Sequence, residues 1–207
     1  MEKKGYLLLE DGTLYTGVLR GAQKDAAAEL VFLTSVVGYM DTLTDPAYAG
    51  QIVVQTFPQI GNYGVVPVAE GAKPCLAGYV CRELCDKPSN FRCEYDLDTY
   101  LKNNNIPGLY GVDTRELTNR IREYGVVNAM ITDKLPEDFD EIVSYTITGA
   151  VEAATCKEAT VYPAESAEQA HVVVIDCGFS GTMVKALTAR GCRVTVGGET
   201  KFACVDG

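Results

Sequence analysis

Thiol chemistry assisted by a histidine is the first reaction to consider in this sequence, which holds eight cysteines and one histidine. A cysteine becomes a strong nucleophile when a histidine takes its proton, and such a nucleophile commonly sits on a Gly-rich turn between a strand and a helix. No cysteine here lies in a G-x-C-x-G sequence. Cys177-Gly178 comes closest, and His171 begins an apolar run six residues earlier. We interpret His171 as structural, so no catalytic residue is predicted.

The cysteines could instead bind a metal ion, because several of them are close in sequence. The four concerned are Cys75, Cys81, Cys85 and Cys93. They form no C-x-x-C pair, and the histidine is far away, so the spacing does not match that of a zinc site. Reduced, partly buried thiols are the expectation, and no metal is predicted.

Turn-forming residues gather in three clusters, at residues 34–39, 43–48 and 57–64. They read T-S-V-V-G-Y, L-T-D-P-A-Y and F-P-Q-I-G-N-Y-G. Their glycines allow backbone conformations that other residues avoid, and their prolines fix turns. We expect these residues to shape loops rather than to touch a substrate. Three tyrosines accompany the turns, and they either line an interface or are buried with satisfied hydroxyl groups: Tyr39, Tyr48 and Tyr63.

The elements that position these clusters are predicted to be strands. Runs rich in β-branched and aromatic residues indicate strands, and an Asp-Gly pair at residues 11–12 between two such runs indicates a β-hairpin. The expected strands cover residues 6–9, 14–19, 29–34, 51–57 and 76–80.

Helical signals appear after residue 95. A short helix is expected to begin in residues 96–101 and to end at residues 103–105. A second helix is capped by Asp113 or Thr114 and ends at Gly125, and a strand at residues 126–132 follows it. These elements predict a β-rich domain with helices on one side.

The C-terminal third has a different character. Residues 136–170 are acidic and rich in Ala and Thr, with a short helix expected after Pro136, and the part from residue 150 onwards is interpreted as a linker. Residues 171–176 form a nearly continuous apolar run, typical of a strand buried on both faces. A helix and a strand at residues 192–196 follow, which is a β-α-β unit, the normal opening of a parallel-sheet domain.

Composition narrows the class of protein. The charged fraction is 22% and the net charge −10, which argues against nucleic acid or an anionic membrane as partner. No apolar run reaches the roughly 20 residues of a membrane helix. The N-terminus has no signal-peptide pattern, so a cytoplasmic protein is expected.

Two further segments complete a resemblance to a known family. Residues 89–92 read S-N-F-R and residues 108–115 read G-L-Y-G-V-D-T-R. With the three turn clusters, they resemble the N-terminal domain of the small, glutamine-hydrolysing subunit of carbamoyl-phosphate synthase, from about Leu7 to Thr132. Residues 175–178 and 190–196 resemble only the opening of that family's class I glutamine amidotransferase domain.

The resemblance implies a fold class and a domain organisation. The expected class is α/β. A β-rich N-terminal domain with flanking helices (β/β/α type) would cover residues 1–135, and an acidic linker residues 136–170. Residues 171–207 would form a truncated β-α-β opening of a parallel-sheet amidotransferase domain. The family's catalytic triad would lie downstream of Gly207, so the chain is expected to be inactive alone.

The resemblance also implies a biochemical role. The family supplies ammonia from glutamine to a large subunit, which makes carbamoyl phosphate for arginine and pyrimidine biosynthesis. The expected partner is therefore the large subunit, and ATP and Mg²⁺ belong to it, so no cofactor is expected here. Ala47 stands where the family has a glutamine-contacting serine, so a hydroxyl contact to the substrate is lost.

Other interpretations remain at this point. The chain could be a stand-alone interaction module without a catalytic role. Residues 175–182 also resemble the I-D-x-G-x-x-x-T phosphate loop of actin-like and sugar-kinase-like ATPases, in which the loop joins two strands of a hairpin. Residues 180–182 and the tail after Val196 depart from the amidotransferase pattern, which we interpret as a truncated or frameshifted product or a fragment.

Overall fold

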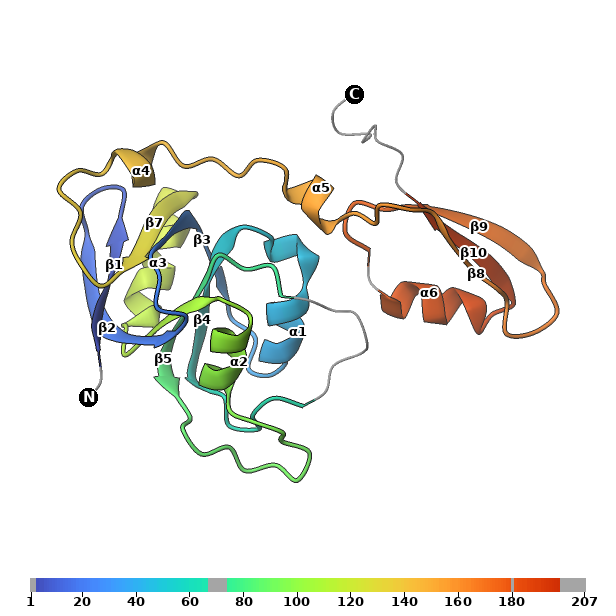
Figure 1. Cartoon of the computed structure of the whole chain (residues 1–207), viewed down its shortest axis with the longest axis horizontal. Coiled ribbons are helices and arrows are strands. Elements are labelled where there is room, and N and C mark those ends of the chain that lie inside the picture. The colour runs from blue at the N-terminus through green and yellow to red at the C-terminus, as the bar shows by residue number, and fades with distance from the viewer. Residues whose placement is uncertain (1–2, 67–73, 180, 198–207) are drawn as a thin grey trace. The chain divides into compact units, whose positions relative to one another are not determined.

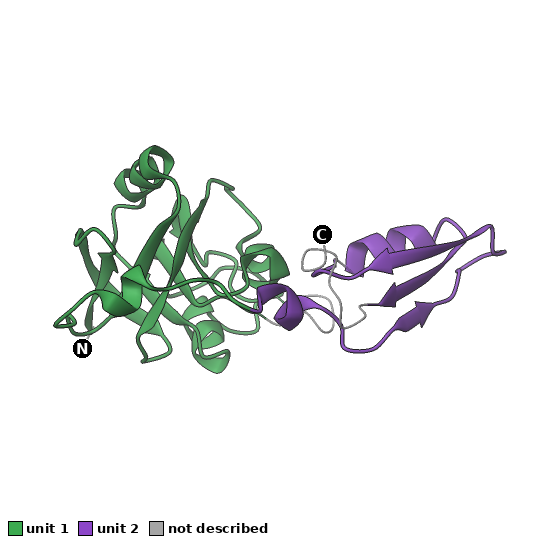
Figure 2. Cartoon of the chain, turned by 90° about the horizontal axis from the view of Figure 1, so that it is seen from above, with its two compact units in different colours: residues 1–148 green, residues 149–207 purple. Residues whose placement is uncertain are grey.

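The computed structural model describes residues 3–66, 74–179 and 181–197 (Figure 1). The chain divides into two compact units, residues 1–148 and residues 149–207 (Figure 2). The mixed α/β class expected from the sequence is confirmed. Its finer β/β/α type and the predicted boundaries near residues 135 and 170 stay predictions.

Unit 1 is built on a closed β-barrel in the order β1-β2-β6-β5-β4-β3-β7. The hairpin expected around residues 11–12 is confirmed, because β1 and β2 pair antiparallel with Leu8 opposite Leu14. Pairing of β1 with β7, which sets Leu7 opposite Ile131, closes the barrel. Its strands are β1 (Lys4–Leu9), β2 (Leu14–Gly21), β3 (Ala26–Leu33), β4 (Gln51–Ile60), β5 (Gly78–Leu84), β6 (Pro107–Tyr110) and β7 (Val127–Thr132).

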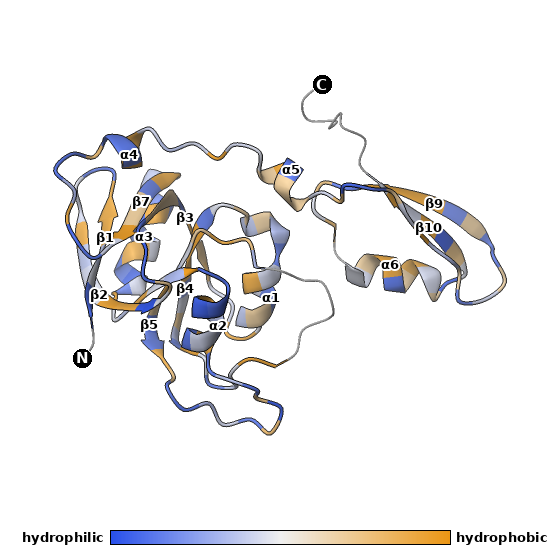
Figure 3. Ribbon diagram, viewed as in Figure 1, coloured by the Kyte–Doolittle hydropathy of each residue, from blue (hydrophilic) through white to orange (hydrophobic). Residues whose placement is uncertain are grey.

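Alternate residues of these strands fill two hydrophobic cores. One core contains fully buried residues such as Leu7, Ile52 and Leu109 together with Leu117 of helix α3 (Thr114–Tyr124). Residues of opposite parity, such as Val53 and Tyr79, pack instead against helices α1 (Tyr39–Thr44) and α2 (Leu97–Asn103) in a second core. Figure 3 shows the apolar colour concentrated along the strands. Strands buried on both sides explain why these runs read as continuously apolar.

Short helices accompany the barrel strands. The two helices expected from the sequence are confirmed as α2 (Leu97–Asn103) and α3 (Thr114–Tyr124). Asp113 caps α3 by accepting hydrogen bonds from the amides of Arg115 and Glu116, both at 3.1 Å. The remaining helical segments of unit 1 are α1 (Tyr39–Thr44), the 3-10 helix η1 (Pro46–Tyr48) and α4 (Asp140–Val143).

Unit 2 is a three-stranded sheet in the order β8-β10-β9, with helix α6 following β9. The predicted β-α-β unit is confirmed, since β9 and β10 run parallel. The same pairing contradicts the ATPase phosphate loop, which would join two strands of a hairpin. Strand β8 pairs antiparallel with β10 inside the segment interpreted as a linker. The elements are α5 (Ala150–Ala154), β8 (Thr160–Tyr162), β9 (Ala170–Ile175), α6 (Gly181–Thr188) and β10 (Cys192–Gly197).

The expectation that β9 is buried on both faces is wrong. Val173 and Ile175 are 67% and 70% exposed. Val172 and Val174 point to the opposite face, where Val184 of α6 and Val194 of β10 form the small core of unit 2. The apolar run therefore marks a sheet with only one of its two faces covered by the described residues.

Two expectations fall partly or wholly outside the described residues. These are the departures from the amidotransferase pattern at Ser180 and in the tail from residue 198 onwards. Among the described helices, none has the length and apolar character that crossing a membrane requires.

Candidate interaction surface at the motif turns

The first and third turn clusters meet in space. Gly38, Gly61 and Gly64 have φ angles of 86°, 88° and 65°, which confirms that these turns need glycine. The Tyr39 hydroxyl donates a hydrogen bond to the Gly64 carbonyl oxygen at 2.7 Å. The Tyr39 and Tyr63 rings stack with 4.1 Å between their centroids. Two segments more than twenty residues apart are thus locked together.

Burial keeps this tyrosine pair neutral. Tyr39 is 2% exposed, and burial raises the pKa of its hydroxyl well above the usual value. Burial also raises the pKa of Tyr63, although backbone hydrogen bonds from Met40 and Gly38 oppose the change. Both hydroxyls therefore remain protonated near neutral pH. The pair is interpreted as a structural clamp, because neither group is poised to accept or release a proton.

A second loop, residues 85–94, lies on the third cluster. The Ser89 amide donates to the carbonyl oxygen of Asn62 at 2.9 Å, and the Cys85 amide donates to that of Ile60 at 2.8 Å. A Cβ atom added to Gly64 would lie 2.2 Å from the Cys93 sulfur. The turn and the 85–94 loop are therefore in direct contact.

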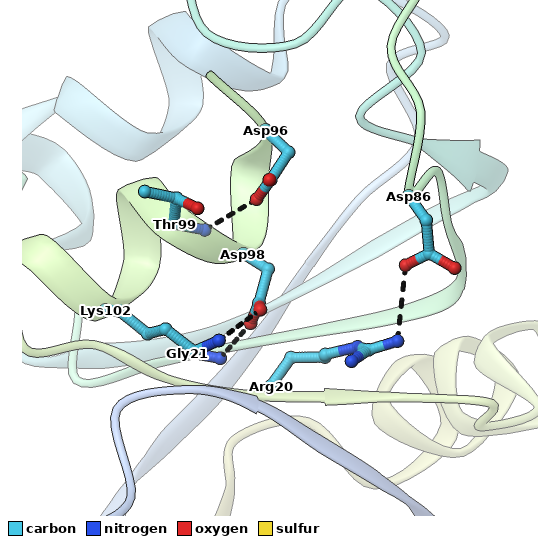
Figure 4. Close-up of polar contacts among 7 residues, drawn as sticks. All are labelled: Arg20, Gly21, Asp86, Asp96, Asp98, Thr99 and Lys102. Carbon is cyan, nitrogen blue, oxygen red and sulfur yellow. Dashed lines mark hydrogen bonds and ion pairs between the residues drawn. The ribbon is translucent and has the colours of Figure 1, made fainter. Parts of the chain in front are cut away.

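Polar contacts hold the base of the 85–94 loop and the neighbouring helix (Figure 4). The Arg20 guanidinium pairs with the Asp86 carboxylate at 3.2 Å and lies over the Tyr110 ring. Asp98 of α2 accepts a hydrogen bond from the Gly21 amide at 2.7 Å. The loop base and α2 are thereby both tied to the end of β2.

Sequence reasoning missed the buried amide that holds the first cluster to the barrel. Gln55 is 1% exposed, and its Nε2 donates to the carbonyl oxygen of Ser35 at 2.7 Å and to the Ser35 hydroxyl at 3.2 Å. The next residue, Thr56, shares a hydrogen bond of 2.9 Å with Thr118 of α3. A polar Gln-Thr pair inside the apolar run of β4 was the available signal.

Comparisons with known proteins give the family. The model of the carbamoyl-phosphate synthase small chain, CPSase domain, matches residues 7–131. The carbamoyl phosphate synthase small chain of Fusobacterium nucleatum is 43% identical over 92% of this chain and 54% of its own length. That of Bacillus thuringiensis is 40% identical over 93% of this chain and 53% of its own length.

The chain belongs to the carbamoyl-phosphate synthase small chain family. The relative from Caldanaerobacter subterraneus is 52% identical over 65% of this chain and 38% of its own length. This chain spans about half the length of the small chains that match over nearly all of it. The family domain runs from Leu7 in β1 to Ile131 in β7, so it coincides with the closed barrel.

Ala47 is the residue that the resemblance predicts to stand at a glutamine-contacting position. It lies in η1 with an exposed side chain, and its amide donates to the Asp45 carboxylate at 2.9 Å. Asp45 in turn accepts a contact of 3.6 Å from the Cys75 thiol on its carbonyl oxygen. The aspartate and proline predicted to fix this turn therefore do so, while the role of Ala47 stays a prediction.

The residues considered for thiol chemistry, Cys177 and His171, lie apart in this chain. His171 is exposed on β9, and its Nε2 is 2.8 Å from the Thr195 hydroxyl. Residue 192 pairs with residue 170 in the parallel register, so Cys192 and His171 project to opposite faces. Cys177 follows the end of β9, and the span from His171 to Ile175 alone is about 13 Å at 3.3 Å per residue.

The cysteines considered for zinc are also dispersed. Cys81 is buried in β5, and burial raises the pKa of its thiol to about 12. The Cys93 thiol contacts the carbonyl oxygen of Tyr95 at 3.3 Å. In the part of the chain that the structure describes, no three histidine, cysteine or carboxylate side chains gather as a metal site.

Proposed function

We propose that this chain acts in glutamine-dependent carbamoyl-phosphate synthase by docking on the large chain through its barrel unit. In this proposal, glutamine supplies the ammonia, and the large chain, with ATP and Mg²⁺, makes carbamoyl phosphate for arginine and pyrimidine biosynthesis. The coincidence of the family domain with a closed, self-filled barrel carries the proposal. A barrel interior filled with its own side chains has no space for a ligand, so binding falls to the outer surface and the loops.

The arrangement of thiols and histidine supports a docking role without catalysis. Hydrolysis of glutamine through a cysteine would need a histidine within hydrogen-bond reach of the thiol. The single histidine, His171, contacts a threonine instead. We therefore expect these 207 residues to bind a partner and not to hydrolyse glutamine.

Ala47 gives the proposal a substrate-facing position. The alanine methyl group cannot hydrogen-bond glutamine, so any contact with substrate at this turn would be through the backbone. The amide of Ala47 is already engaged by Asp45, which leaves its carbonyl group as the candidate contact.

The proposal is tested by sedimentation velocity with the large chain of carbamoyl phosphate synthase from the same organism. The expected result is a 1:1 complex at micromolar concentrations, together with no ammonia release from glutamine by this chain alone. Sedimentation of the two chains as separate species would contradict docking. Ammonia release at a rate proportional to the concentration of this chain would contradict the absence of catalysis.

A second candidate function is a stand-alone interaction module that serves another partner. The exposed apolar side chains of unit 2, Val161, Val173 and Ile175, favour it, because such a surface is typical of an interface. Deleting residues 149–207 separates the two functions. Docking by unit 1 would survive the deletion, whereas an interaction through unit 2 would be lost.

A further inference from the structure

Phe91 is the most exposed of the large apolar side chains among the described residues, at 93% of its surface. It belongs to the 85–94 loop, which projects from the barrel between β5 and α2 (Figure 1). Exposing a phenylalanine completely forgoes the roughly 1.5–3 kcal/mol that burial of such a side chain provides. The folded unit therefore gains almost no burial energy from an apolar side chain at this position.

Hydrogen bonds donated by backbone amides nevertheless hold the loop around Phe91. The Asn90 carboxamide oxygen accepts a hydrogen bond from the Arg92 amide at 3.0 Å, and the Cys93 amide donates to the Asn90 carbonyl oxygen at 3.0 Å. Both bonds begin at Asn90 and reach past Phe91, so they form one tight turn that contains Phe91. The Gly61–Gly64 turn supports the loop from below through the contacts of Ser89 and Cys93 described above. A preorganised loop backbone lowers the entropy lost when a side chain of the loop is buried against a partner.

The charged residues next to Phe91 indicate what kind of partner surface the loop would fit. Residues 87–92 read K-P-S-N-F-R and hold two cations, and the loop's two carboxylates flank them at Asp86, which pairs with Arg20, and at Glu94. The Arg92 guanidinium lies 5.3 Å from the centre of the Phe91 ring. Among the described residues, neither Lys87 nor Arg92 forms an ion pair. An apolar ring with two cations near it is complemented by an apolar socket that has carboxylates at its rim. Aromatic and arginine side chains are also the residue types that dominate interface hot spots.

We propose that Phe91 is the anchor by which this chain docks on the large chain, entering an apolar socket whose rim carboxylates pair with Arg92. This inference rests on the proposed docking function and assigns that function to particular side chains. In this proposal the first and third turn clusters, residues 34–39 and 57–64, serve to hold the loop that carries Phe91.

The test measures affinity for the immobilised large chain of the same organism by biolayer interferometry. Phe91→Ala is expected to weaken binding about 30-fold, as loss of a central aromatic anchor does. Arg92→Glu is expected to weaken it about 10-fold at low salt and less at 0.5 M salt, because salt screens charge pairs. Since Phe91 and Arg92 are both exposed, both variants should unfold at the wild-type temperature.

Tyr124→Ala is the matched control. Tyr124 is also an exposed aromatic residue, 65% accessible, with the Arg120 guanidinium 5.4 Å from its ring centre, but it lies on α3. Its removal should change the affinity by less than about twofold, as for a residue outside the hot spot.

Equal losses for Phe91→Ala and Tyr124→Ala would overturn the anchor and leave docking intact. Failure of the wild-type chain to bind would overturn docking itself. A wild-type dimer that Phe91→Ala disrupts, with large-chain binding unchanged, would assign the socket to a second copy and also overturn the proposal.

Discussion

At the scale of single residues, Gly64 shows how a turn depends on its neighbours. Its φ of 65° lies in the left-handed region, which costs a non-glycine residue about 1–2 kcal/mol. A Cβ atom there would also meet the Cys93 sulfur and, at 2.9 Å, the Pro88 side chain. Crowding of this kind adds about 1–3 kcal/mol. Gly64→Ala is therefore expected to lower the free energy of unfolding by about 2–5 kcal/mol in urea denaturation.

Gly111→Ala is the control for the backbone contribution alone. Gly111 has a φ of 85°, and the nearest atom to an added Cβ is 3.9 Å away. It should lose only about 1–2 kcal/mol. If the two variants proved equally unstable, packing between the turn and the 85–94 loop would contribute nothing.

Residue types predicted where the turns lie but not which residues they contact. Glycine and proline indicate a turn from the local sequence, and the positive φ angles of Gly38, Gly61 and Gly64 confirmed the predicted turns. The hydrogen bond of Gln55 to Ser35 and the contact of Gly64 with Cys93 join residues twenty or more apart in sequence. No local pattern encodes such pairs, so these parts of the candidate surface had to come from the structure.

At the scale of elements, the turn between β9 and α6 depends on one buried carboxylate. Asp176 is 1% exposed, and its oxygens accept hydrogen bonds from the amides of Cys156, Gly178 and Phe179 at 2.7–2.9 Å. Burial raises the pKa of Asp176, but these hydrogen bonds outweigh it, and the pKa falls below its usual 3.8. The stabilisation is therefore complete above about pH 4 and is lost as the pH falls through the lowered pKa.

Asp176→Asn is expected to destabilise unit 2 by about 1–3 kcal/mol at pH 7, because an amide nitrogen cannot accept the bond from Cys156. Hydrogen exchange of peptides from residues 149–197 measures the effect. Between pH 5 and pH 3 the variant should lose less protection from exchange than the wild type, because asparagine has no carboxylate to protonate. Glu168→Gln is the control, since Glu168 makes only an exposed pair of 3.4 Å with Arg193. Equal exchange in the two variants at pH 7 would contradict the assignment.

Elements with strong local signals were predictable, and elements defined by their partners were not. The cap at Asp113 and the Asp-Gly turn of the first hairpin were visible in the sequence. Strand β8 was hidden, because its three residues pair only with β10. The apolar run of β9 indicated two covered faces, whereas α6 covers one and the described residues leave the other exposed.

At the scale of the whole molecule, unit 1 has what an independent domain needs. Its barrel, its flanking helices and three of the four hydrophobic clusters all lie within residues 1–148. A chain of residues 1–148 is therefore expected to fold alone. Its thermal midpoint should lie within about 3 °C of the main transition of the full chain, the shift that 1 kcal/mol produces at this size. Aggregation or a non-cooperative melt by circular dichroism would show that residues 149–207 are required.

The closed barrel also sets the order of events while the chain is being made. β1 spans Lys4–Leu9, and its second neighbour, β7, spans Val127–Thr132. At about 5–20 residues per second, the ribosome takes several seconds or more to deliver the later strand. Throughout that interval, the first strand has β2 on one side and an unpaired row of amide and carbonyl groups on the other. Nascent chains that stall before Val127 therefore cannot close the ring, which makes them natural clients for a chaperone.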